Sequence, residues 1–151
     1  MFLQKKEIKE LNELITQLYG WADFFQPKKD QVELKEDIYY KNKKASFFML
    51  NNKPVPFLTI VHDINPFPMV VIDMQAVPFI AKGADLMRPG ITELPEFQKD
   101  AIVSIVDMQH KKVIALGIAL FSSEEIKALE KGKVIKVIHY VGDKLWQITK
   151  Q

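Results

Sequence analysis

Only one segment of this chain keeps helical apolar spacing over several turns, and turn-forming residues divide much of the remainder into short apolar runs. Within residues 4–19, apolar side chains recur every three or four positions, at Ile8, Leu11, Leu14, Ile15 and Leu18. Gly20 is expected to end this helix. Strand-like runs without a regular strand–helix alternation argue against a doubly wound parallel sheet, so the sequence predicts an α+β fold.

The first half of the chain is predicted to add a small antiparallel sheet to this helix. Asn51, Asn52 and Lys53 form a good hairpin turn between the last two of the apolar runs in this half. The predicted strands cover residues 32–34, 38–40, 45–50 and 55–61. Prolines at Pro66 and Pro68 then mark a domain boundary, placed at Pro66.

The second half, residues 67–151, is predicted to form a β-barrel-like fold with two short helices. The predicted strands cover residues 70–73, 102–107, 113–121, 135–141 and 145–149, with tight turns at 108–112 and 142–144. One helix is expected shortly after residue 73, ended by a turn at 88–90. The other begins at Ser122, where Glu125 completes a capping box, and runs to about residue 131 before Gly132.

Composition narrows the class of protein. The 151 residues are 48% hydrophobic and include no cysteine, which excludes disulfides, thiolate zinc sites and cysteine nucleophiles. No apolar run approaches the ~20 residues of a membrane helix, and the charged start does not resemble a signal peptide, so we expect a cytoplasmic protein. The net charge is +2, with +1 in each half, so any nucleic acid must be bound by a local patch and not by bulk charge.

Catalytic and metal-binding patterns are missing from the sequence. His62, His110 and His139 are too widely spaced to predict a zinc site. The serines lie outside any nucleophile-elbow pattern, and Ser104 is expected to be a small strand residue. No phosphate-binding loop is present. We therefore expect no enzyme, no metal and no cofactor.

The segment from Asp73 to Ile91 is the best candidate for binding. Lys82 stands beside Gly83 and Ala84, whose small size would let a partner approach the backbone, and Arg88 supplies a second cation for an anionic partner such as RNA. The alternative is that the glycines merely serve turns and Met87 is a core residue; the residues alone leave both interpretations open. Asp73 is expected to cap a turn, and Asp85 to orient Arg88.

Residues 83–91, Gly-Ala-Asp-Leu-Met-Arg-Pro-Gly-Ile, resemble the signature of the PUA domain, an RNA-binding module. Residues 138–146 and 55–62 are similar to a narrower group that joins a pre-PUA domain to a PUA domain. That group contains the malignant-T-cell-amplified-sequence translation factors and their stand-alone archaeal relatives. The resemblance implies a pre-PUA domain at 1–66 and a PUA domain at 67–151, the latter a mixed β pseudo-barrel.

The resemblance also implies an RNA-binding groove that recognises tRNA, often at its 3′ CCA end, or ribosomal RNA. Lys82 and Arg88 would meet phosphates or base edges, and Gln75 stands where the family usually has glycine. The RNA-binding residues carried over from the motif are Ala81, Lys82, Gly83, Ala84, Met87, Arg88, Pro89, Gly90, Tyr140 and Val141.

The family further implies action in translation, with the small ribosomal subunit or a translation factor as a partner, and no membrane or DNA. Two alternatives remain. Trp21, Phe24, Phe25 and the Phe47–Phe48 pair would serve an adaptor that docks a protein, unless they are core residues. A detached specificity module of an RNA-modification enzyme is the other alternative.

Overall fold

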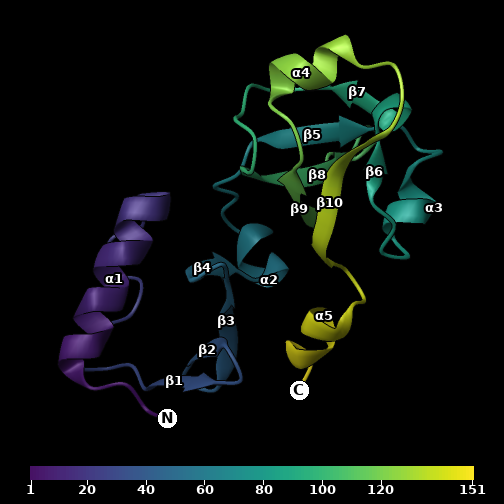
Figure 1. Cartoon of the computed structure of the whole chain (residues 1–151). Coiled ribbons are helices and arrows are strands. Elements are labelled where there is room, and N and C mark those ends of the chain that lie inside the picture. Colours follow the sequence, from purple (N-terminus) through teal and green to yellow (C-terminus); the bar gives the residue numbers. More distant parts are fainter. The chain divides into compact units, whose positions relative to one another are not determined.

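In the computed structural model, which describes residues 1–151, the chain divides into two units, Met1–Ile60 and Val61–Gln151 (Figure 1). The division falls a few residues before the boundary expected at Pro66. No helix in the chain combines the length and the apolar character needed to cross a membrane.

The first unit begins with the predicted helix. Helix α1 spans Lys5–Tyr19 and buries Ile8, Leu11 and Ile15, as the apolar spacing predicts. Gly20 ends it in the left-handed conformation, with φ of 74°, and its N–H bonds the carbonyl of Thr16. Local sequence signals were therefore sufficient for this element.

A four-stranded antiparallel sheet completes the first unit. Its strands follow one another in the order β1-β2-β3-β4, and the Asn51–Asn52 turn has positive φ at both residues, as a two-residue hairpin requires. The strands are β1 Val32–Lys35, β2 Ile38–Lys41, β3 Lys44–Leu50 and β4 Lys53–Pro56.

The strand predicted at residues 55–61 is wrong beyond Pro56. The chain turns there into a short helix, α2, at Leu58–Val61. A continuous apolar run is compatible with a buried strand or a buried helical turn, so periodicity could not separate the two.

The aromatic residues expected either to dock a protein or to fill the core belong to the core of the first unit or pack against it. Phe25 and Phe47 are fully buried, and the Phe24 ring packs edge-on against Phe47 with centroids 4.9 Å apart. Trp21 stacks on Phe24 and is half-buried. These rings therefore pack with one another in the interior of the first unit.

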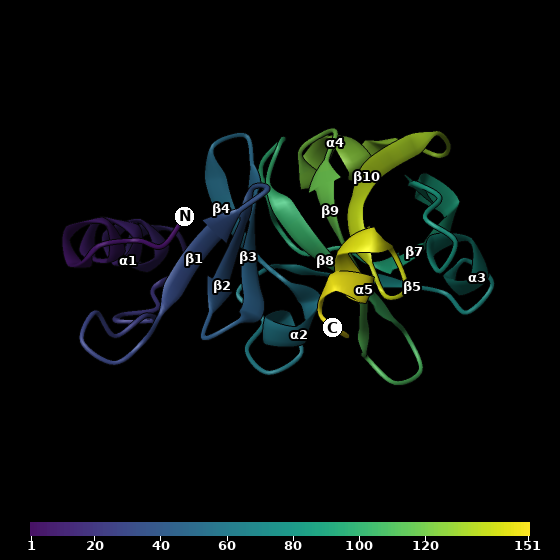
Figure 2. The same cartoon turned by 90° about the horizontal axis from the view of Figure 1, so that it is seen from below.

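The second unit is a curled, mixed six-stranded sheet in the order β6-β10-β9-β8-β5-β7. Only β5 and β8 pair in parallel, with Met69 opposite Ser104 and Ile72 opposite Asp107. The sheet's curvature is visible in Figure 2, where β10 bends away from β9 into α5. The strands are β5 Met69–Ile72, β6 Leu86–Met87, β7 Ile91–Glu93, β8 Ile102–Asp107, β9 Val113–Ala119 and β10 Lys133–Tyr140.

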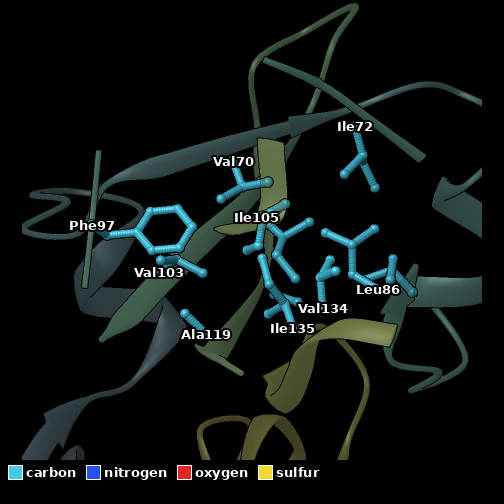
Figure 3. Close-up of a cluster of buried hydrophobic side chains, with 12 residues drawn as sticks. Val70, Ile72, Leu86, Phe97, Val103, Ile105, Ala119, Val134 and Ile135 are labelled. Atoms are coloured by element: carbon cyan, nitrogen blue, oxygen red, sulfur yellow. The ribbon is translucent and has the colours of Figure 1, made fainter. Parts of the chain in front are cut away.

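The hydrophobic core of this unit lies inside the curl. Side chains from several strands meet there, and Leu86 of the short strand β6 lies beside Val134 and Ile135 of β10 (Figure 3). Four short helical elements connect or cap the strands. They are α3 Val77–Ile80, the 3₁₀ turn η1 Arg88–Gly90, α4 Ser123–Ala128 and α5 Lys144–Ile148.

The predicted helices and strands of this half need three corrections. The strand predicted at residues 145–149 is wrong, because residues 145–148 lie in helix α5, whose first turn is capped by the Asp143 carboxylate accepting the Trp146 N–H at 2.7 Å. Helix α4 starts with the expected Ser122 capping box but ends at Ala128. Strands β6 and β7 are too short to have a detectable period and were not predicted.

Asn12 is the one polar side chain that α1 buries, and it ties the helix to the following loop. Its Nδ2 donates to the Phe25 carbonyl at 2.7 Å, and its Oδ1 accepts the Phe25 N–H at 3.0 Å. Asn12→Ala would leave both backbone groups of Phe25 buried and unpaired. We expect a loss of about 2–3 kcal/mol in the free energy of unfolding, measured by urea denaturation.

Gln17→Ala is the matched control, because Gln17 is an exposed amide on the same helix. It should change stability by less than about 0.5 kcal/mol. Equal stabilities for the two variants would show that the Asn12 hydrogen bonds do not hold the loop.

Candidate functional site

A groove of about 390 Å³ opens beside α3, β6 and η1 in the second unit. Its floor includes the buried side chains of Ile80 and Leu86. Phe79 and Met87 also line it, yet they are 66% and 48% exposed, so two large apolar side chains stand at a hollow in the surface. The remaining lining residues are Asp73, Gln75, Ala76, Asp85, Pro89 and Gly90.

The residues expected to bind RNA are divided between this groove and its surroundings. Met87, Pro89 and Gly90 line the groove itself. Lys82 lies on the exposed turn after α3 and makes no ion pair within the chain. Ala81 and Ala84 are exposed on the same turn, and Val141 is exposed just after β10.

Gly83 and Tyr140 are brought together from distant parts of the sequence. Gly83 has φ of +90°, and a Cβ added to it would lie 2.8 Å from the Tyr140 ring. The positive φ and the lack of room for a Cβ both require glycine at this position. The close approach that this glycine allows is therefore made by Tyr140, whereas the sequence predicts the approach of a binding partner such as RNA.

Arg88 is turned toward α4. Its Nε–H donates to the carbonyls of Ile126 and Leu129, at 2.8 and 3.1 Å, where α4 ends. A cation at the carbonyl end of a helix is favourable, and this one anchors η1 to α4. The Nε–H is thus committed within the protein, a role that the sequence did not reveal because the partners are far away in the chain.

The expectation that Asp85 orients Arg88 is wrong. Asp85 Oδ1 accepts the Val137 N–H at 2.9 Å, and Oδ2 pairs with Lys133 Nζ at 3.0 Å. Burial raises the pKa of Asp85, but the Val137 hydrogen bond and Lys133 outweigh it, so the pKa lies below its ordinary value. Asp85 therefore joins the α3–β6 segment to β10 as a carboxylate.

Asp73 has the predicted role in a turn. Its Oδ1 accepts the Ala76 N–H at 3.0 Å, one turn before α3, and its backbone N–H donates to the Gly90 carbonyl. Gln75, within that turn, has no positive φ, so the backbone needs no glycine there. The Gln75 side chain is exposed and lines the groove instead.

Ser104, His62 and His139 make hydrogen bonds within the protein. Ser104 Oγ donates to the Pro68 carbonyl and accepts from Asn65. His139 is fully buried, with Nδ1 3.0 Å from Asp143 Oδ2, and His62 Nε2 lies 2.8 Å from the Val113 carbonyl. No group of three acidic or histidine side chains is arranged to hold a metal ion.

Asp143 is the residue in this unit that the sequence reasoning missed. Its carboxylate accepts the backbone N–H of Tyr140 as well as that of Trp146, and it faces His139. Burial raises its pKa, but these hydrogen bonds lower it further than burial raises it. Aspartate before an apolar run was the available signal, because that pattern is typical of a helix N-cap.

We expect Gly83→Ala to destabilise the protein by about 2–4 kcal/mol, because the new methyl group meets the Tyr140 ring and the residue keeps a positive φ. Thermal or urea unfolding would measure this. In a Tyr140→Ala background the steric part disappears, so the same substitution should cost only about 1–2 kcal/mol. An equal cost in both backgrounds would show that the ring contact is unimportant.

The comparisons with known proteins agree with this architecture. The PUA domain family matches residues 68–141. An uncharacterized protein of Methanocaldococcus jannaschii is 37% identical, over 96% of this chain and 93% of its own length. Translation machinery-associated protein 20 of Saccharomyces cerevisiae is 33% identical, over 82% of this chain and 75% of the yeast protein. Malignant T-cell-amplified sequence 1 of Rattus norvegicus is 28% identical, over 91% and 83% of the two chains.

Two solved structures extend the comparison. A hypothetical protein of Pyrococcus horikoshii has a TM-score of 0.78 and 32% identity, and the match covers 99% of this chain and 98% of that one. A chain of an H/ACA RNP bound to a substrate RNA has a TM-score of 0.51 and 28% identity, over 63% of this chain and 29% of its own.

The expected α+β fold, with a helix and an antiparallel sheet before a curled mixed sheet, is confirmed by these structures. So is the resemblance recognised in residues 83–91. The chain belongs to the family of PUA-domain proteins that includes translation machinery-associated protein 20 and the malignant T-cell-amplified sequence proteins.

Proposed function

We propose that this protein is a non-catalytic RNA-binding protein that acts in translation. The observation that carries the proposal is the groove beside α3, β6 and η1, which is built from the segment that matches the PUA domain. The comparisons add support, since one relative is named for the translation machinery and one structural neighbour is a chain of an H/ACA RNP that is bound to a substrate RNA.

The groove best fits an unpaired RNA end, such as the 3′ end of tRNA, or an unpaired stretch of ribosomal RNA. Exposed apolar side chains at a hollow suit bases that have left a helical stack. A paired helix would present mainly phosphates to the groove, and none of the groove's lining residues is cationic. The surroundings supply the positive charge, because Lys82 is exposed on the adjoining turn.

Binding without chemistry fits the side chains present. The groove is lined by no serine, histidine or lysine, and its two carboxylates accept hydrogen bonds from the protein's own backbone. The adaptor alternative loses its original basis, since the aromatic residues proposed for docking lie in the core of the first unit. The small ribosomal subunit remains a proposed partner, which this protein would contact through ribosomal RNA.

Binding of tRNA with and without its 3′ CCA end, over a salt series, tests the proposal. Tighter binding of the intact tRNA, with a shallow salt dependence, is the expected result. Equal binding of both forms would move the proposal to ribosomal RNA. Absence of binding to tRNA and to ribosomal RNA alike would overturn it.

Lys82→Glu should weaken tRNA binding and reduce the salt dependence by about one ion without lowering stability, because Lys82 makes no internal ion pair. Lys99→Glu is the matched control. Lys99 is exposed and lies just before β8, whereas α3 and Lys82 come after β5. Because β5 and β8 are parallel, Lys99 and Lys82 lie at opposite ends of this strand pair. Equal effects of the two substitutions would show that charge alone, and not this site, matters. Arg88 is unsuitable for this test because it anchors α4.

A further inference from the structure

We infer that the groove selects an unpaired base that carries an exocyclic amino group, cytosine or adenine, over uracil, and that Asp73 reads this group. The inference rests on the proposed function and specifies the ligand of the same groove. It follows from the groove's charge, from its exposed apolar side chains and from the one carboxylate oxygen that the protein leaves without a donor.

The groove's charge excludes a phosphate from its interior. The lining holds two carboxylates and no cationic side chain. Asp85 is balanced by Lys133 at 3.0 Å, but no cation lies within salt-bridge distance of Asp73. A phosphate would therefore meet a net negative wall, so the sugar–phosphate chain must run outside the groove, where Lys82 is exposed.

The apolar lining suits the flat face of a base. Phe79 comes from α3 and Met87 from β6, and both are largely exposed while the floor beneath is buried. An unstacked base can stack on an aromatic ring, and a thioether makes favourable contacts with aromatic rings. A base bound here would cover apolar surface that otherwise faces water.

Asp73 supplies the discrimination between bases. Its Oδ1 accepts the Ala76 N–H, while Oδ2 receives no hydrogen bond from the protein. A carboxylate accepts from the N4 amino group of cytosine or the N6 amino group of adenine, whereas uracil presents the O4 acceptor at the same place. Gln75 lines the same groove, and its amide can pair with an adenine edge.

Short homopolymeric RNAs of equal length test this, with affinities measured by fluorescence anisotropy at one salt concentration. Oligocytidylate and oligouridylate are the main pair, because both are pyrimidines and their backbones are the same. We expect oligocytidylate, and likewise oligoadenylate, to bind about tenfold more tightly than oligouridylate, the ratio expected of one charged hydrogen bond.

Asp73→Asn is the diagnostic variant. Asparagine keeps an oxygen to accept the Ala76 N–H, so the turn before α3 is retained, but its amide can donate to uracil O4. The cytidylate-to-uridylate ratio should fall to about one or invert. A circular dichroism melt that matches the parent's would confirm that the fold is intact.

Asp100→Asn is the control, because it removes the same negative charge at an exposed loop residue. Asp100 lies before β8, at the end of the parallel β5–β8 pair that is far from α3. It should raise binding of all RNAs slightly and leave the ratio unchanged. A parent that binds both homopolymers equally, or an unchanged ratio in Asp73→Asn, would overturn the inference while leaving RNA binding in place. Failure of every RNA to bind would instead overturn the proposed function.

Discussion

The hydrogen bond from the Val137 N–H to Asp85 is the contact on which the candidate site depends. Strand β6 pairs with β10 over only a few residues, and beyond them Asp85 takes the place of a neighbouring strand. Lys133 holds the same carboxylate from β10. Because the Asp73–Ile91 segment contains little regular structure, such side-chain contacts are what keep it against the sheet and keep the groove open.

Two further contacts fix the same segment at other points. Arg88 bonds the carbonyl end of α4, and the Tyr140 ring lies against Gly83. Arg88 and Gly83, which belong to the family motif, therefore help to build the groove. A charged residue in a binding motif, such as Arg88, can thus serve the fold, whereas Lys82 on the exposed turn after α3 makes no ion pair within the chain.

Negative and positive side chains occupy different parts of the candidate site. Carboxylates line the groove and exposed Lys82 lies outside it, so under the proposed function phosphates and bases would be directed to different places. A modest net charge of +2 is then sufficient, since binding would depend on a local arrangement and not on a polycationic surface.

The sequence by itself determined the elements whose signals are local. The α1 periodicity, the Asn51–Asn52 turn and the Ser122–Glu125 capping box each involve residues a few positions apart, and each appears in the structure. The PUA signature likewise led to the right family and fold.

Only the tertiary structure decided which residues the site residues contact. It also decided whether short apolar runs form a helix or a strand. Arg88 reaches Ile126, and Gly83 meets Tyr140, across long separations that no periodicity encodes. Residues 58–61 and 145–148 became helical turns where strands had been expected. Packing and capping choose between helix and strand when a short run is wholly apolar, and they act only once the distant parts of the chain are in place.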